Sequence, residues 1–229
     1  MPDQRGYNLS DVPRGVQAYA LPELVADVVG LLDHFEIAEA RVVGHDWGAL
    51  VAWSLALAYP ERVARLAILN VPHPLAILSL LRSSPGQWLK SWYVGFFQLP
   101  RLPEWLLRRG RFGLMLAMLA ASRRPNRFSD EELEEYRAAY ARSGGLTGML
   151  NWYRALLRYR PPLPADGRVH MPVLILWGMH DVALSARLAE SSLRYCTDGR
   201  LIRYPDATHW VQHDEALAVN EALLAFLEA

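Results

Sequence analysis

Short apolar runs alternate with helical segments along this chain of 229 residues. Four such runs are expected to be strands: residues 40–46, 63–71, 172–177 and 200–204. Four other segments carry apolar residues at helical spacing: residues 21–35, 47–59, 185–195 and 214–227. Because helices between buried strands build βαβ units, we expect an α/β domain with a mostly parallel sheet.

The stretch from Pro72 to Pro172 has a different character. Five helices interrupted by prolines are expected within it: residues 75–81, 87–97, 104–119, 130–142 and 146–159. Ser129 and Glu132 form the capping-box pattern that begins one of these helices. The sequence therefore predicts a discontinuous α/β core, residues 1–72 and 172–229, with an all-helical cap, residues 73–171, inserted between its halves.

Charge and cysteine content exclude several classes of protein. The chain has 24 Lys and Arg against 24 Asp and Glu, so nothing in its net charge favours nucleic acid or an anionic membrane. The lone Cys196 excludes an internal disulfide and a zinc site built from cysteines. The N-terminus lacks the apolar stretch of a secretory signal, and no apolar run reaches the ~20 residues that span a bilayer. We expect a cytoplasmic protein that uses no cofactor or metal and binds neither nucleic acid nor membrane.

The most informative motif is Gly44-His45-Asp46-Trp47-Gly48, which joins the first expected strand to a helix. Its Gly-x-Asp-x-Gly spacing is that of a nucleophile elbow, with aspartate in place of serine. The glycines suit a tight and strained turn. The N–H groups at the start of the helix would keep the Asp46 carboxylate ionised and nucleophilic. The alternative is an ordinary turn in which Asp46 is the helix N-cap.

Two residues further along the chain complete a catalytic pattern. Asp181 follows the third expected strand, and His209 follows the fourth. This chain order, nucleophile then acid then histidine, is the order found after a nucleophile elbow. Since the carboxyl ends of parallel strands meet at one edge of the sheet, we expect Asp46, Asp181 and His209 to lie together.

Three segments resemble the epoxide hydrolases of the α/β-hydrolase superfamily: Pro2 to Tyr7, Gly44 to Gly48 and Asn151 to Arg154. The resemblance extends over essentially the whole chain. It implies an α/β-hydrolase fold whose inserted helical cap places two tyrosines over the nucleophile. Tyr93 and Tyr153 stand in the matching motifs, and their O–H groups would stabilise and protonate the oxygen of an opening epoxide.

The resemblance also implies a reaction. Asp46 would attack a small apolar epoxide to form an ester, and His209, oriented by Asp181, would activate the water that hydrolyses the ester to a vicinal diol. Trp47 and His45 would line the pocket, with the backbone N–H of Trp47 directed at the ester oxyanion.

Haloalkane dehalogenases share the elbow motif and remain an alternative. They require a halide-binding tryptophan where epoxide hydrolases have a tyrosine. Trp92 and Trp152 stand next to Tyr93 and Tyr153, so the sequence leaves this reading open.

The resemblance further implies that the amino-terminal strands of the family are absent, together with a His-Gly-x-Pro-like loop that supplies an oxyanion donor. We interpret the sequence as an N-terminally truncated sheet, with Met1 internal to a longer enzyme. The loss of one oxyanion donor can cost about 10²–10³ in turnover. The expected strand over residues 40–43 would also have an open edge. A catalytically inactive remnant that binds apolar ligands or a partner chain, or that forms a homodimer, is therefore a further alternative.

Overall fold

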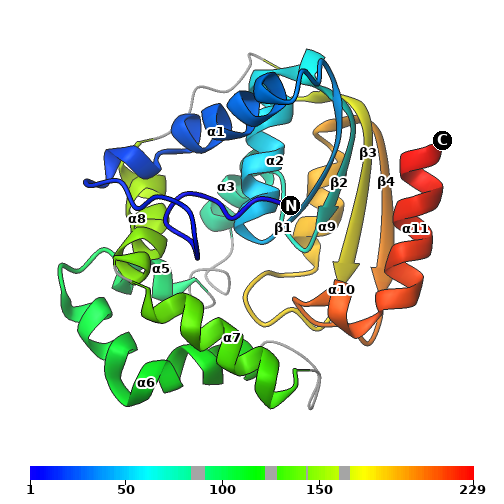
Figure 1. The fold of residues 1–229 in the computed structure, drawn as a ribbon. Coiled ribbons are helices and arrows are strands. Elements are labelled where there is room, and N and C mark those ends of the chain that lie inside the picture. The colour runs from blue at the N-terminus through cyan, green and yellow to red at the C-terminus, as the bar shows by residue number, and fades with distance from the viewer. Residues whose placement is uncertain (84–90, 122–127, 143, 160–165) are drawn as a thin grey trace. The chain divides into compact units, whose positions relative to one another are not determined.

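The structure is a computed structural model that describes residues 1–83, 91–121, 128–142, 144–159 and 166–229. By its internal contacts the chain divides into two compact units (Figure 1). The helical unit comprises Met1–Leu24 and Ser91–Pro161, and the α/β unit comprises Val25–Lys90 and Pro162–Ala229. Within the described ranges, no helix is long and apolar enough to cross a membrane.

The α/β unit is built on a four-stranded sheet in the order β1-β2-β3-β4. All three neighbouring pairs are parallel, so the predicted α/β class and parallel sheet are confirmed. The strands are β1 (Ala40–His45), β2 (Val63–Leu69), β3 (Val169–Gly178) and β4 (Cys196–Tyr204).

Strands β3 and β4 begin earlier than expected. Pro172 suggests a strand boundary, yet β3 already pairs with β4 at Val169, opposite Cys196. A register irregularity between Val169 and Pro172 accommodates the proline, which cannot donate a backbone hydrogen bond.

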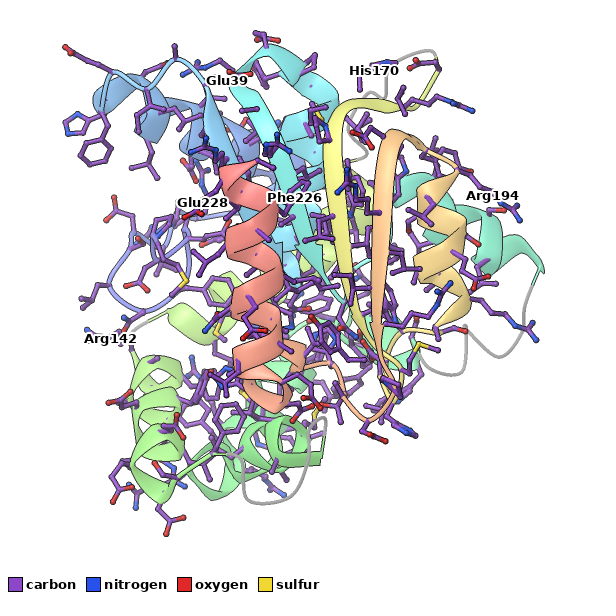
Figure 2. The ribbon with its side chains drawn as sticks, turned by 90° about the vertical axis from the view of Figure 1, so that its right-hand side faces the viewer. Glu39, Arg142, His170, Arg194, Phe226 and Glu228 are labelled. Atoms are coloured by element: carbon purple, nitrogen blue, oxygen red, sulfur yellow. The ribbon has the colours of Figure 1, made fainter. Side chains whose placement is uncertain are left out.

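Helices cover both faces of this sheet (Figure 1). On one face, α11 (Ala216–Glu228) contributes Val219 and Phe226 to a core cluster with Ala67 and Leu69 of β2. Figure 2 labels Phe226 on this helix, in front of the strands. The other face is covered by α2 (Trp47–Ala58) and α9 (Arg187–Leu193). Five further helical elements lie in residues 1–83 and 210–229: η1 (Gln17–Tyr19), α1 (Leu21–His34), η2 (Pro60–Arg62), α3 (Pro74–Ser83) and α10 (Val211–Asp214).

The helical unit contains α5 (Trp92–Phe96), α6 (Leu102–Ala121), α7 (Asp130–Ala141) and α8 (Gly145–Arg158). The predicted capping box is confirmed, because Ser129 and Glu132 exchange side chain-to-backbone hydrogen bonds at the start of α7. The helix expected over residues 104–119 is interrupted: Gly110, Arg111 and Phe112 have positive φ angles. Glycine enters this conformation readily, which explains where the helix breaks. Residues 87–90 of another expected helix lie outside the described ranges.

The first residues of the chain pack within the helical unit. The Trp152 indole N–H donates to the carbonyl of Arg5 over 3.1 Å. Gly6 approaches Gly148 so closely that a Cβ on Gly148 would lie 2.8 Å from the Gly6 Cα. Units defined by contacts need not follow the division of a fold into core and insertion. The expected boundaries at residues 72 and 172 therefore stay a prediction.

Candidate active site

The turn between β1 and α2 has the strained geometry of an elbow. Asp46 has φ 48° and ψ −127°, a conformation that non-glycine residues rarely adopt. Behind it, a Cβ on Gly44 would lie 2.6 Å from the Cα of Ala49, so glycine is required there. The backbone carbonyl of Asp46 accepts from the N–H of Ala49, but its side chain makes no capping hydrogen bond and is 54% exposed. The turn therefore presents the carboxylate to solvent and does not use it to cap α2.

Asp46, Asp181 and His209 lie together in the α/β unit. The Nε2 atom of His209 is 3.6 Å from Oδ1 of Asp46, and its Nδ1 atom is 2.7 Å from Oδ2 of Asp181. Asp181 follows β3 and His209 follows β4, so adjacent parallel strands deliver the two residues to the same edge of the sheet. The structure thus places the imidazole between two carboxylates, one exposed and one buried.

The buried carboxylate is fully hydrogen-bonded. Oδ2 of Asp181 accepts from His209 Nδ1 and from Nδ2 of Asn70 at 2.9 Å. Oδ1 accepts from the backbone N–H groups of Ala183 at 2.8 Å and Leu184 at 2.9 Å. Burial alone would raise the pKa of Asp181, but these hydrogen bonds and the charge of His209 hold the pKa below its usual value. Asp181 is therefore a fixed negative charge behind the imidazole.

Asn70 is a site residue that the sequence reasoning missed. It follows β2, is fully buried and has φ 50°. Besides its bond to Asp181, its Oδ1 accepts from the backbone N–H of Gly178 at 2.8 Å. The available signal was its position at the carboxyl end of a buried strand, the same argument that singled out Asp181 and His209.

The two carboxylates control the protonation of His209. Burial would lower the pKa of His209, but the hydrogen bond that its Nδ1–H donates to Asp181 and the negative charges of Asp181 and Asp46 outweigh burial and raise the pKa to about 10. Desolvation of the carboxylate by the surrounding protein would by itself raise the pKa of Asp46. The His209 imidazolium, whose Nε2 atom is 3.6 Å away, and the backbone N–H of Trp47 together lower it. At neutral pH the resting site thus holds an imidazolium between two carboxylates.

His45 and Trp47 flank Asp46 in the chain. Trp47 is the first residue of α2 and is half-buried. Both ring nitrogens of His45 have partners: Nε2 lies 2.9 Å from the carbonyl oxygen of His209, and Nδ1 lies 3.2 Å from Nε2 of Gln212. Burial, followed by the charge of His209, lowers the pKa of His45 to about 4.

Tyr93 and Tyr153 are neighbours within the helical unit. Their ring centroids are 5.9 Å apart and their planes are nearly perpendicular, at 79°. Both pack against an apolar cluster that includes Phe97 and Leu150. The Gln98 amide donates to the carbonyl of Tyr153 over 3.0 Å, which joins the segment after α5 to α8.

A buried ion pair reinforces the same junction. Arg154 on α8 forms a bidentate bridge to Glu104, with N–O distances of 2.7 and 3.1 Å. The same guanidinium donates to the carbonyls of Phe97 and Leu99, each at 2.9 Å. Side-chain exposure is 8% for Arg154 and 15% for Glu104, so solvent screens the bridge little. This bridge fixes α8, which carries Tyr153, against the chain that follows Tyr93.

The tryptophans beside the two tyrosines have different surroundings. Trp152 is buried and its N–H is engaged by the carbonyl of Arg5. Trp92 is 64% exposed. As for metals, no group of three or more His, Cys, Asp or Glu side chains in the described ranges is arranged to hold an ion.

Comparison of the chain with known proteins identifies its family. The model of the alpha/beta hydrolase fold family matches residues 1–216. The chain belongs to the α/β-hydrolase fold family. This α/β-hydrolase is 41% identical to AB hydrolase superfamily protein YfhM of Bacillus subtilis, over 99% of this chain and 79% of that protein.

Several other relatives of this α/β-hydrolase are named epoxide hydrolases. It is 36% identical to Epoxide hydrolase 2 of Caenorhabditis elegans, over 98% of this chain and 64% of that protein. A crystal structure of a Bacillus megaterium epoxide hydrolase with an inhibitor superimposes with a TM-score of 0.88 and 27% identity, over 99% of this chain and 82% of that one. The chain thus spans less than two thirds of the worm protein. The predicted fold and the resemblance to epoxide hydrolases are confirmed.

Proposed function

We propose that this α/β-hydrolase is an epoxide hydrolase that adds water to a small apolar epoxide to make a vicinal diol. The observation that carries the proposal is the aspartate at the elbow, with His209 3.6 Å away and Asp181 bonded behind the imidazole. A carboxylate nucleophile suits attack on a saturated carbon, because the resulting ester can still be cleaved by water. The relatives named epoxide hydrolases support the same activity.

In the first step, an oxygen of Asp46 attacks one ring carbon of the epoxide. The C–O bond of the strained ring breaks, and the oxygen leaves as an alkoxide on the neighbouring carbon. We assign Tyr93 and Tyr153 as the donors that stabilise this charge and protonate it. Their adjacent rings in the helical unit support this assignment, since two phenols only 5.9 Å apart can both address one oxygen.

In the second step, His209 acts as a base. Its high pKa at rest depends partly on the negative charge of Asp46, and ester formation removes that charge. The imidazolium then releases its proton, which restores the tyrosine that protonated the alkoxide. Neutral His209, oriented by Asp181, takes a proton from water, and the resulting hydroxide attacks the ester carbonyl. The backbone N–H of Trp47 stabilises the oxyanion before the diol leaves and Asp46 becomes a carboxylate again.

The surroundings of the tryptophans favour this activity over haloalkane dehalogenation. A halide site needs indole N–H groups that are free to bind the leaving ion. The N–H of Trp152 already donates to the carbonyl of Arg5 and so does not meet this requirement.

A binding protein without catalysis is the second candidate. Its support is the sheet order, in which β1 has β2 on one side and no strand on the other within the described ranges. Such an edge presents unpaired backbone groups to a partner chain or to a second copy.

The decisive experiment traps the ester. His209→Gln protein is incubated with an aryl epoxide, and in parallel with a bromoalkane, and its intact mass is measured. We expect a mass gain equal to the whole epoxide, because the ester forms but lacks the base that hydrolyses it. Asp46→Asn on the same background should abolish the gain. His34→Gln, which makes the same change at an exposed histidine, should accumulate none.

The two other outcomes are equally informative. A mass gain from the bromoalkane alone, equal to the mass of the bromoalkane minus that of HBr, would identify a dehalogenase. No gain from either reagent in a folded protein would overturn the proposal and leave the binding function.

A further inference from the structure

His45 links the nucleophile to the base through one side chain. It directly precedes Asp46 in the chain, and its Nε2 atom lies 2.9 Å from the backbone carbonyl of His209. The two imidazole centroids are 4.8 Å apart, and the His45 ring also lies 5.1 Å from the ring of Trp210. The position of the His209 backbone relative to the elbow therefore depends on this contact.

The partners of His45 determine where its proton lies. A carbonyl oxygen only accepts hydrogen bonds, so Nε2 must carry the proton that is donated to His209. The nitrogen of an amide only donates, so the Nδ1 atom facing Gln212 must carry a lone pair. The ring is thus a neutral imidazole in a single tautomer.

The amide of Gln212 is oriented toward this tautomer at the expense of its own oxygen. The Oε1 atom is buried, and none of the residues that the structure describes forms a hydrogen bond with it. Turning the amide over would place Oε1 against Nδ1, and that contact is favourable only if Nδ1 is protonated as well. The orientation of Gln212 and the charge of His45 are therefore linked.

We propose that Gln212 and His45 form a positioning pair: Gln212 keeps the proton of His45 on Nε2, and that N–H holds the backbone of His209 so that its imidazole stays between Asp46 and Asp181. This inference rests on the proposed function for its catalytic consequence. The geometry of the pair itself is independent of the reaction.

The neutral state of His45 has an electrostatic consequence. The charged groups that act on it are His209, Asp46 and Asp181, while Trp210 and Gln212 contribute an uncharged ring and an amide. A second imidazolium in this place would compete with His209 for Asp46 and destabilise the charge on His209. A neutral His45 leaves the carboxylate to His209 alone.

Gln212→Glu tests the pair with almost no change of shape. The introduced carboxylate accepts a proton from Nδ1 and so stabilises doubly protonated His45. Asn220→Asp, on the exposed side of α11, adds the same charge elsewhere in the α/β unit and is the matched control. Gln212→Met removes the amide without adding charge, and serves if the first variant fails to fold.

The first measurement is the titration of the ring nitrogens by NMR on histidine-labelled protein. In the wild type we expect His45 to be protonated on Nε2 alone from pH 5 to 8. In Gln212→Glu its midpoint should rise above pH 7, and the midpoint of His209 should fall by at least about one pH unit. Gln212→Met removes the donor that faces Nδ1, so part of the His45 population should carry its proton on Nδ1 and the His209 signals should broaden. Asn220→Asp should match the wild type throughout.

The second measurement is a single turnover with an aryl epoxide. Hydrolysis of the ester should slow by about tenfold or more in Gln212→Glu at pH 7, more than ester formation does. A wild-type His45 that is protonated on Nδ1, or a His209 midpoint unchanged in both Gln212 variants, would overturn the proposal. If the wild type forms no ester, the proposed function fails, and the His209 midpoints still decide whether the pair positions that ring.

Discussion

Asp181→Asn is the substitution whose effect can be worked out most fully. The carboxylate accepts at least two hydrogen bonds at each oxygen: from His209 and Asn70 at Oδ2, and from the N–H groups of Ala183 and Leu184 at Oδ1. An asparagine has one acceptor atom, so its NH₂ group must face two donors in either orientation: His209 and Asn70, or the backbone N–H groups of Ala183 and Leu184. Breaking a buried charge pair while its partner stays in place costs about 3–5 kcal/mol of folding free energy.

The cost depends on pH because Asp181 helps to raise the pKa of His209. The rise from 6.5 to about 10 corresponds to at most about 5 kcal/mol, shared between Asp181 and the more exposed Asp46. A raised pKa stabilises the folded state fully below pH 6.5, and the stabilisation is lost as the pH rises through about 10. The stability gap between wild type and Asp181→Asn should therefore be largest near pH 6 and narrow toward pH 10.

Urea unfolding at pH 6, 8 and 10 measures this gap, and Asp198→Asn, at an exposed aspartate on β4, is the control. In kinetics, the variant should still form the ester but hydrolyse it about 10³–10⁴-fold more slowly, because the imidazole loses its oriented tautomer. A gap that stays constant or widens with pH would refute the electrostatic reasoning. A variant that hydrolyses the ester at the wild-type rate would refute the assigned role.

Three further predictions concern the supports of the site. Arg154→Met should lower the free energy of unfolding by about 3–5 kcal/mol in urea titrations, and Glu104→Leu on that background should recover most of it. If the double variant is no more stable than the single one, loss of the ion pair does not explain the lower free energy of unfolding. Gly44→Ala should lower the free energy of unfolding by about 1–3 kcal/mol and remove most of the ester formation, because the added methyl group meets the backbone of Ala49. A fully active variant would contradict this prediction. Val43→Lys, at a 45% exposed position of the edge strand β1, should reduce any self-association seen by light scattering, and unchanged association would show that another surface is responsible.

Local pattern determined most of the fold class. Short apolar runs bounded by turn-forming residues predict strands, and all four expected strands exist. The elbow was visible because its two glycines and its aspartate lie within five residues of the sequence, and Asp181 and His209 because each lies in the loop after a strand. Strand boundaries were less predictable. Strand β3 begins at Val169, before Pro172, because its pairing with β4 already starts there, and the residue types at 169–172 do not indicate this pairing.

Only the tertiary structure decided how the site is held in place. Asn70 meets Asp181 across 111 positions of the chain, and His45 meets Gln212 across 167. Such contacts depend on strand order and on backbone angles at single residues, whereas hydrophobic periodicity reports only which side of an element is buried. The sequence by itself therefore determined which chemical groups are available and at which edge of the sheet they lie. The protonation of His209 and His45 was decided by partners that only the folded chain brings within hydrogen-bonding distance, because a pKa responds to burial and to neighbouring charges in space.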